Sequence, residues 1–126
     1  MNDAPHLPEI LAAVAAFLRD AVVPQATPLV AFQARVAANA VDLVTRQLTF
    51  ARAADAAEHD RLRALLGRDG SLAELTAALA GCLASGSLDL ASPGVAAHLR
   101  ATTLAKLAVD QPNYSGYRAA LADKDD

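Results

Sequence analysis

Apolar residues near the start of the chain recur at intervals of three and four, the spacing of one face of an α-helix. Ile10, Val14 and Phe17 form this stripe. We expect the helix to begin near Pro8, since proline suits the first helical turn. It should end at Val23, because the residue before a proline disfavours the helical backbone conformation. The sequence contains no strand-like alternation of apolar and polar residues.

A second, longer helix is predicted from Thr27–Pro28, a capping residue followed by proline at the first helical position. It should extend to about Phe50. Phe32, Val36 and Leu43 recur at helical spacing within it. We expect these three side chains to form the inner, core-facing stripe of the helix.

Residues 53–66 form the most highly charged segment. They are either a third helix or a continuation of the second helix with a kink near Ala51–Arg52. Asp55–His59 and Glu58–Arg61 are spaced to pair across one helical turn. Gly67 is typical of the residue that follows a helix end.

Ser71 and Glu74 have the spacing of a capping box, which is the most specific local signal in the sequence. They should start a helix that reaches about Ser85. Ser92–Pro93 should cap the last long helix, which is expected to reach about Val109. The pattern as a whole predicts an all-α fold, a bundle of about five helices joined by short loops.

Length and composition favour one domain that spans residues 1–126, with residues 1–7 and 123–126 frayed. The chain has 126 residues, of which 54% are hydrophobic and 20% charged, which is too apolar for a disordered chain. The net charge of −3 argues against a nucleic-acid groove, because such a groove needs an excess of Lys and Arg. The chain has no apolar stretch long enough to span a bilayer, and its first residues lack the features of a signal peptide. We therefore expect a cytoplasmic protein with no nucleic-acid or membrane partner.

The residues that usually carry metal or cofactor chemistry are scattered. His6, His59 and His98 lie on three separate segments and form no paired-histidine motif. Cys82 is the single cysteine, and its neighbours are small or apolar, as in a buried structural cysteine. No glycine-rich phosphate loop follows a strand. We expect no metal, no cofactor and no catalytic residue, which favours a non-enzymatic role.

Two polar groups are the candidates for ligand or partner binding. Arg35 and Asn39 belong to a polar stripe on the second helix, which is either a recognition face or the solvated side of that helix. Lys106 and Asp110 lie one turn apart on the last long helix. They are either a functional pair in a cleft or an ion pair that ties the helix end to the tail. The full set of candidate site residues is Arg35, Asn39, Arg100, Lys106, Asp110 and Tyr114.

Low charge on two helices predicts an interface. Residues 71–85 and 92–109 carry few charged side chains, which is more apolar helix than a small domain easily encloses. Leucines such as Leu79 would supply the association, beside a small-residue face that lets another helix approach closely. We therefore expect a homodimer, or a heteromer that uses the same face. The small-residue face consists of Ala73, Ala77, Ala80 and Ala84.

A family resemblance is carried by two stretches, residues 32–39 (FQARVAAN) and residues 98–114 (HLRATTLAKLAVDQPNY). They resemble a bacterial family of short helical proteins classed as a domain of unknown function, and the resemblance covers nearly the whole chain. Genes of that family often lie beside genes for aminoglycoside-phosphotransferase-like kinases and acyl-CoA dehydrogenases. The resemblance implies a cytosolic accessory protein linked to acyl-CoA catabolism, with a protein of one of these two classes as its partner. It supplies no catalytic residues.

Three functional interpretations follow from these observations. The preferred one is the accessory or interaction protein that the resemblance implies. The second is a small ligand-binding protein or enzyme, which requires its polar residues to converge on one pocket. The third is a homo-oligomeric structural protein. The pocket of the second interpretation would be formed by Arg35, Asn39, Arg100, Lys106 and Asp110.

Overall fold

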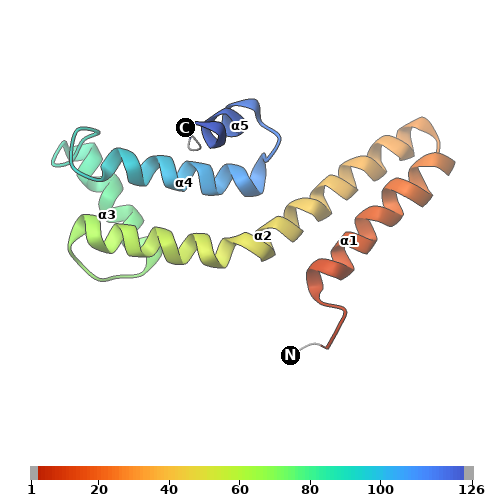
Figure 1. Ribbon diagram of the computed structural model, residues 1–126, viewed down its shortest axis with the longest axis horizontal. Helices are drawn as coiled ribbons and strands as arrows, with labels where there is room; N and C mark the ends of the chain where they lie inside the picture. The colour runs from red at the N-terminus through yellow and green to blue at the C-terminus, as the bar shows by residue number, and fades with distance from the viewer. Residues whose placement is uncertain (1–2, 124–126) are drawn as a thin grey trace. The chain divides into compact units, whose positions relative to one another are not determined.

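The computed structural model describes residues 3–123, and every regular element in this range is helical (Figure 1). The predicted all-α fold is confirmed, with 79% of the residues in helices and five α-helices. These are α1 (Leu7–Phe17), α2 (Pro28–Leu66), α3 (Leu72–Ser85), α4 (Val95–Asp110) and α5 (Ser115–Ala122), with a π-helical turn (Leu18–Val22) and a 3-10 turn (Val23–Gln25) after α1.

The chain divides into two compact units, of which the first ends at Ala51 and the second begins at Arg52. Each unit is described on its own. That residues 1–126 form one domain stays a prediction. Of the ends expected to fray, residues 1–2 and 124–126 lie outside the described residues, whereas Leu7 is the first residue of α1 and Asp123 follows the last residue of α5.

The first helical segment ends where the sequence predicts, and a separate 3-10 turn follows it. α1 gives way after Phe17 to a π-helical turn, in which the backbone N–H of Val23 donates to the carbonyl oxygen of Leu18. Val23 keeps a helical backbone with φ −54° and ψ −47°. Pro24 then lies in the first turn of the 3-10 segment, where its missing N–H leaves no bond unmade. The π-helical turn ends at Val22 with Val23 as its C-cap residue, so the prediction that the helix ends at Val23 is confirmed, and the proline belongs to a separate 3-10 turn.

The start of α2 matches the predicted cap. The carbonyl oxygen of Thr27 accepts a hydrogen bond from Ala31 N–H at 2.8 Å, and its Oγ1 accepts one from Val30 N–H at 3.4 Å. α2 then continues from Pro28 to Leu66 as one helix. Of the two predicted alternatives, the structure shows the continuation, with residues 53–66 belonging to α2.

The first unit is a helical hairpin, in which α1 and the first half of α2 run antiparallel side by side (Figure 1). The residues buried between them are alanines: Ala15 on α1, and Ala31, Ala34 and Ala38 on α2. Alanine side chains let two helix backbones approach closely, but they bury little apolar area. The core of this unit is therefore small.

The prediction that Phe32, Val36 and Leu43 face this core was wrong, because all three side chains are exposed. Val14 and Phe17 on α1 are exposed as well. The buried line passes instead through Ala15 and the α2 alanines at intervals of three and four. Close packing selects the small side chains for the contact, and this leaves the bulky ones outside.

The second unit has a core of leucine side chains. Leu62 of α2 and Leu75 and Leu79 of α3 are buried together, and five further leucines pack against them. α3 begins at the predicted capping box: Glu74 N–H donates to Ser71 Oγ at 3.1 Å, and Ser71 N–H donates to Glu74 Oε2 at 2.8 Å. Its end at Ser85 also agrees with the prediction. Gly67 adopts φ +63°, as a residue beyond a helix end often does.

The start of α4 differs from the prediction. Ser92 does not cap the helix, because its Oγ accepts the N–H of Asp89 at 2.9 Å within the preceding turn. The N-cap residue is Gly94, with φ +84°. α4 ends at Asp110, close to the predicted Val109. Within residues 3–123, none of the helices combines the length and the apolar character needed to cross a membrane.

Candidate functional site

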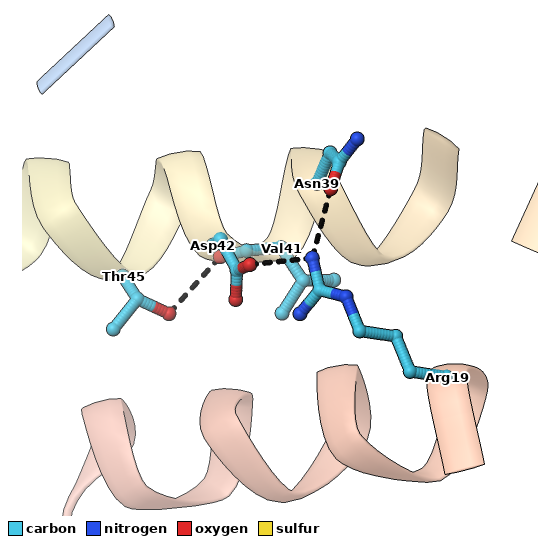
Figure 2. Close-up of polar contacts among 5 residues, drawn as sticks. All are labelled: Arg19, Asn39, Val41, Asp42 and Thr45. Carbon is cyan, nitrogen blue, oxygen red and sulfur yellow. Dashed lines mark hydrogen bonds and ion pairs between the residues drawn. The ribbon is translucent and has the colours of Figure 1, made fainter. Parts of the chain in front are cut away.

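A polar contact links the two helices of the hairpin. Arg19 lies in the π-helical turn, and its Nη2 donates to Asn39 Oδ1 at 2.8 Å and to Asp42 Oδ2 at 2.7 Å on α2 (Figure 2). All three residues are exposed or only partly buried. An ion pair in contact with water contributes a few tenths of a kcal/mol. The contact therefore adds little to the stability of the hairpin.

The larger apolar side chains of the hairpin are exposed, and we refer to them together as the hairpin surface. Those on α1 recur at intervals of three, four and three, so they share one side of that helix. Leu29, Val36, Leu43 and Phe50 on α2 recur every seven residues and also share one side. The hairpin surface consists of Leu7, Ile10, Val14, Phe17, Leu29, Val30, Phe32, Val36, Leu43, Val44, Leu48 and Phe50.

The Arg19 contact and the hairpin surface are not separated into two edges of the hairpin. Phe32 follows buried Ala31 and Asn39 follows buried Ala38, so an exposed aromatic residue and a partner of Arg19 both occupy the position after a buried alanine.

In the second unit, α2 and α4 meet at a polar contact beside a cavity. Arg61 Nε donates to His98 Nδ1 at 3.4 Å, and Arg61 Nη2 donates to Thr102 Oγ1 at 3.2 Å. His98 is 5% exposed, the most deeply buried polar side chain of the described chain. The cavity has a volume of about 400 Å³ and is lined by Arg61, Ala64, Leu65, Pro93, Gly94, Ala97 and His98.

The surroundings of His98 favour its neutral form. Burial lowers the pKa of His98, the nearby Arg61 guanidinium lowers it further, and the Glu58 carboxylate opposes the shift. The imidazole is therefore neutral near pH 7. Because Nδ1 accepts a hydrogen bond from Arg61, the ring proton lies on Nε2.

The structure brings together only some of the sequence-predicted site residues. Arg35 and Asn39 are exposed on the hairpin, and the other four belong to the second unit. Arg100 and Tyr114 line a cavity of about 430 Å³ beside α4 and α5. Arg100 Nη2 also donates to the Ala120 carbonyl oxygen at 3.4 Å.

Lys106 and Asp110 lie outside both of these cavities. Their side chains are exposed, and the interactions of the described residues include no ion pair between them. The predicted pairs within α2 are also replaced by other contacts: His59 Nε2 donates to the Gly70 carbonyl oxygen at 2.7 Å, and Arg61 contacts His98 rather than Glu58.

Sequence reasoning did not single out Arg19, Arg61 or Thr102 as site residues. Arg61 and Thr102 are 41 positions apart in the chain, and only the packing of α4 on α2 brings them together. A contact between residues this far apart in the sequence leaves no local pattern that could predict it. For Arg19, the available signal was the polar stripe on α2, to which its partner Asn39 belongs. Among the described residues, no three His, Cys, Asp or Glu side chains are grouped so that they could hold a metal ion.

Comparisons with known proteins found one match. The search of curated proteins and the search of solved structures each found none. The family described as a domain of unknown function, DUF6285, matches residues 24–114. This range begins in the 3-10 turn, includes all of α2, α3 and α4, and ends at Tyr114. Because the match covers most of its length, the chain belongs to the DUF6285 family.

Proposed function

We propose that this protein is a cytoplasmic accessory protein that acts by binding another protein, and that the hairpin surface is its binding surface. One observation carries this proposal: the hairpin buries alanines and exposes its large apolar side chains. Phe17 is 61% exposed and Phe32 62%, whereas Ala38 is fully buried. The catalytic interpretation has no comparable support among the described residues.

The energetics of the hairpin favour a covering partner. Each buried CH2 group contributes about 0.8 kcal/mol, so a core of alanines stabilises two helices far less than a core of leucines. Fixing the backbone costs about 1–2 kcal/mol for each residue. A partner that covers Val14 and Phe17 would supply the apolar burial that the hairpin lacks.

The extent of the hairpin surface fits a protein partner. Its side chains are roughly half exposed, which for a set of this size corresponds to apolar surface on the order of 1,000 Å². One side of a standard protein interface covers about 800 Å². The partner should therefore present an apolar face of similar size.

The family resemblance supplies the class of partner. It implies a phosphotransferase-like kinase or an acyl-CoA dehydrogenase, linked to acyl-CoA catabolism through neighbouring bacterial genes. Recognition would rest on apolar contact with the exposed side chains of the hairpin surface.

The test is co-sedimentation of the full chain with each of these two proteins in purified form. The variant Val14→Glu/Phe17→Glu places two carboxylates on the hairpin surface, and binding should be lost. The matched control is Ala12→Glu, an exposed alanine of α1 one heptad before Arg19, where binding should persist. Failure of both proteins to bind the unchanged chain, or equal binding by all variants, would contradict the proposal.

Self-association is tested by the same experiment. The sequence placed a homodimer interface on α3, with Leu79 at its edge. Leu79 is 4% exposed and packs in the core of the second unit, so only the alanines of that face remain outside. A homodimer would therefore form through the hairpin surface. A mass of two chains without either partner, reduced to one by Val14→Glu/Phe17→Glu, would support the homo-oligomeric alternative.

The pocket alternative has less support. Of its proposed residues, Arg100 lines the cavity beside α4 and α5, whereas Arg35 and Asn39 lie on the hairpin. Lys106 and Asp110 are exposed on α4. No convergence of these residues supports an enzyme, and the interaction role remains the proposal.

A further inference from the structure

The guanidinium of Arg61 is partly buried without a carboxylate partner. It donates only to neutral acceptors, His98 Nδ1 and Thr102 Oγ1. The ion pairs of the described residues do not include it. A guanidinium has further N–H donors beyond these two, and its charge is costly to remove from water without compensation. The site therefore has unused capacity to bind an anion.

The cavity next to Arg61 is mostly apolar. Its volume of about 400 Å³ lies within the range of small-molecule sites, about 300–1,000 Å³. Besides Arg61 and His98, its walls come from Ala64, Leu65, Pro93, Gly94 and Ala97. A ligand that fits would place an anionic group at Arg61 and an apolar part against these walls.

The first turn of α4 adds hydrogen-bond donors at one end of the cavity. No side chain caps this helix, and its first turn contains no acidic residue. The backbone N–H groups of Ala96 and Ala97 have no acceptor among residues 3–123. Free amides and the helix dipole both favour a negative charge at this position.

Gly94 keeps this helix end open. A Cβ atom at position 94 would lie 3.2 Å from Leu65 Cδ1, and the φ of +84° disfavours any side chain there. A side chain such as Asp, which often caps helices, is thereby disfavoured. The cavity wall and the uncapped helix end thus depend on the same glycine.

We propose that this cavity binds the carboxylate group of a small organic acid with a short apolar chain. Arg61 binds the carboxylate, the Nε2–H of His98 is available as a second donor, and Leu65 and Pro93 contact the apolar chain. This proposal concerns the second unit and is independent of the hairpin surface.

The charges around the cavity favour a carboxylate over a phosphate. Arg61 is the one cation that lines it, which matches a monoanion. His98 is neutral, and the Glu58 carboxylate is close enough to act on His98. A second negative charge on the ligand would have no second cation in the cavity lining to offset it. The planar fork of Arg61 also suits the geometry of a carboxylate.

The test is a titration of the full chain with sodium butyrate, observed through the NMR signals of the His98 ring. We expect a saturable shift with a dissociation constant on the order of 1 mM. Butan-1-ol and inorganic phosphate should each bind at least tenfold more weakly. Equal binding of phosphate or of the alcohol would overturn the proposal, as would the lack of a saturable shift.

Three variants locate the site, and one of them keeps the test valid if another does not fold. Arg61→Gln should weaken butyrate binding at least tenfold, whereas Arg52→Gln, an exposed arginine of the same helix, should leave it unchanged. Ala97→Phe fills the cavity from an exposed position and keeps Arg61, so it too should abolish binding. Butyrate binding that persists in the folded Ala97→Phe protein would overturn the proposal even if Arg61→Gln fails to fold.

Discussion

Leu62 links α2 to the core of the second unit, and its truncation provides a quantitative test of that packing. The side chain is fully buried and contacts a leucine cluster with Leu75 and Leu79. Leu62→Ala removes about three carbon groups, each contributing about 0.8 kcal/mol, and leaves a cavity that adds to the loss. We therefore expect the free energy of unfolding to fall by about 3 kcal/mol.

The assay uses the position of the tyrosines. The sequence has two tyrosines and no tryptophan, and both tyrosines, Tyr114 and Tyr117, lie in the second unit. Tyrosine fluorescence during urea unfolding therefore reports on that unit alone. The control is Leu90→Ala, because Leu90 is 69% exposed and should change stability by less than about 0.5 kcal/mol. A loss below about 1 kcal/mol for Leu62→Ala, with an unchanged slope, would refute the packing described.

Three further results are expected. Ser71→Ala removes the acceptor for Glu74 N–H and should lower the urea midpoint by the equivalent of about 1 kcal/mol; an unchanged midpoint would show that the cap does not form in solution. The pKa of His98 is lowered from 6.5 in the folded chain, so the unfolded chain binds more protons below pH 6.5 and stability should fall as the pH decreases from there. His98→Gln should reduce this pH dependence measured by tyrosine fluorescence, and an identical profile would contradict the assignment. Asp110→Asn should change stability by less than about 0.5 kcal/mol, because Asp110 is exposed; a loss above about 1 kcal/mol would indicate a structural partner.

The helix ends were predictable where a short stretch of chain determines them. Ser71 with Glu74, and Thr27 with Pro28, act within one turn of their own positions, so their residue types are enough to locate the ends of α3 and α2. The prediction of where α4 begins was wrong for a related reason. The Ser92 hydroxyl could cap the helix or accept a hydrogen bond within the preceding turn. It accepts the N–H of Asp89 in that turn, and Gly94 is the N-cap residue instead.

Hydrophobicity alone could not predict which face of each hairpin helix packs against the other helix. On α1 and α2, a stripe of alanines and a stripe of larger apolar residues both recur at helical spacing. Apolar area favours the larger stripe for the core, whereas close approach of two backbones favours the alanines. The structure packs the alanines, and this choice creates the exposed surface on which the proposed function rests.

The candidate site in the second unit depended on contacts between distant parts of the chain. Arg61 could be recognised as a charged residue near Glu58, and the sequence favoured that local pair. The packing of α4 instead supplies His98 and Thr102 as partners. Sequence spacing predicts which residues are neighbours on one helix, but it does not predict which residues of a second helix will contact them.

Amide hydrogen exchange of the full chain tests the central claim most directly. The exchange should be followed by mass spectrometry at increasing chain concentration, and in mixtures with the phosphotransferase-like kinase or the acyl-CoA dehydrogenase. If the hairpin surface binds another protein, residues 7–17 and 28–50 will become protected in one of these conditions, while α3 keeps the exchange rate of the free chain. Protection confined to α3 and α4, or no protection of the hairpin in any condition, would contradict the account.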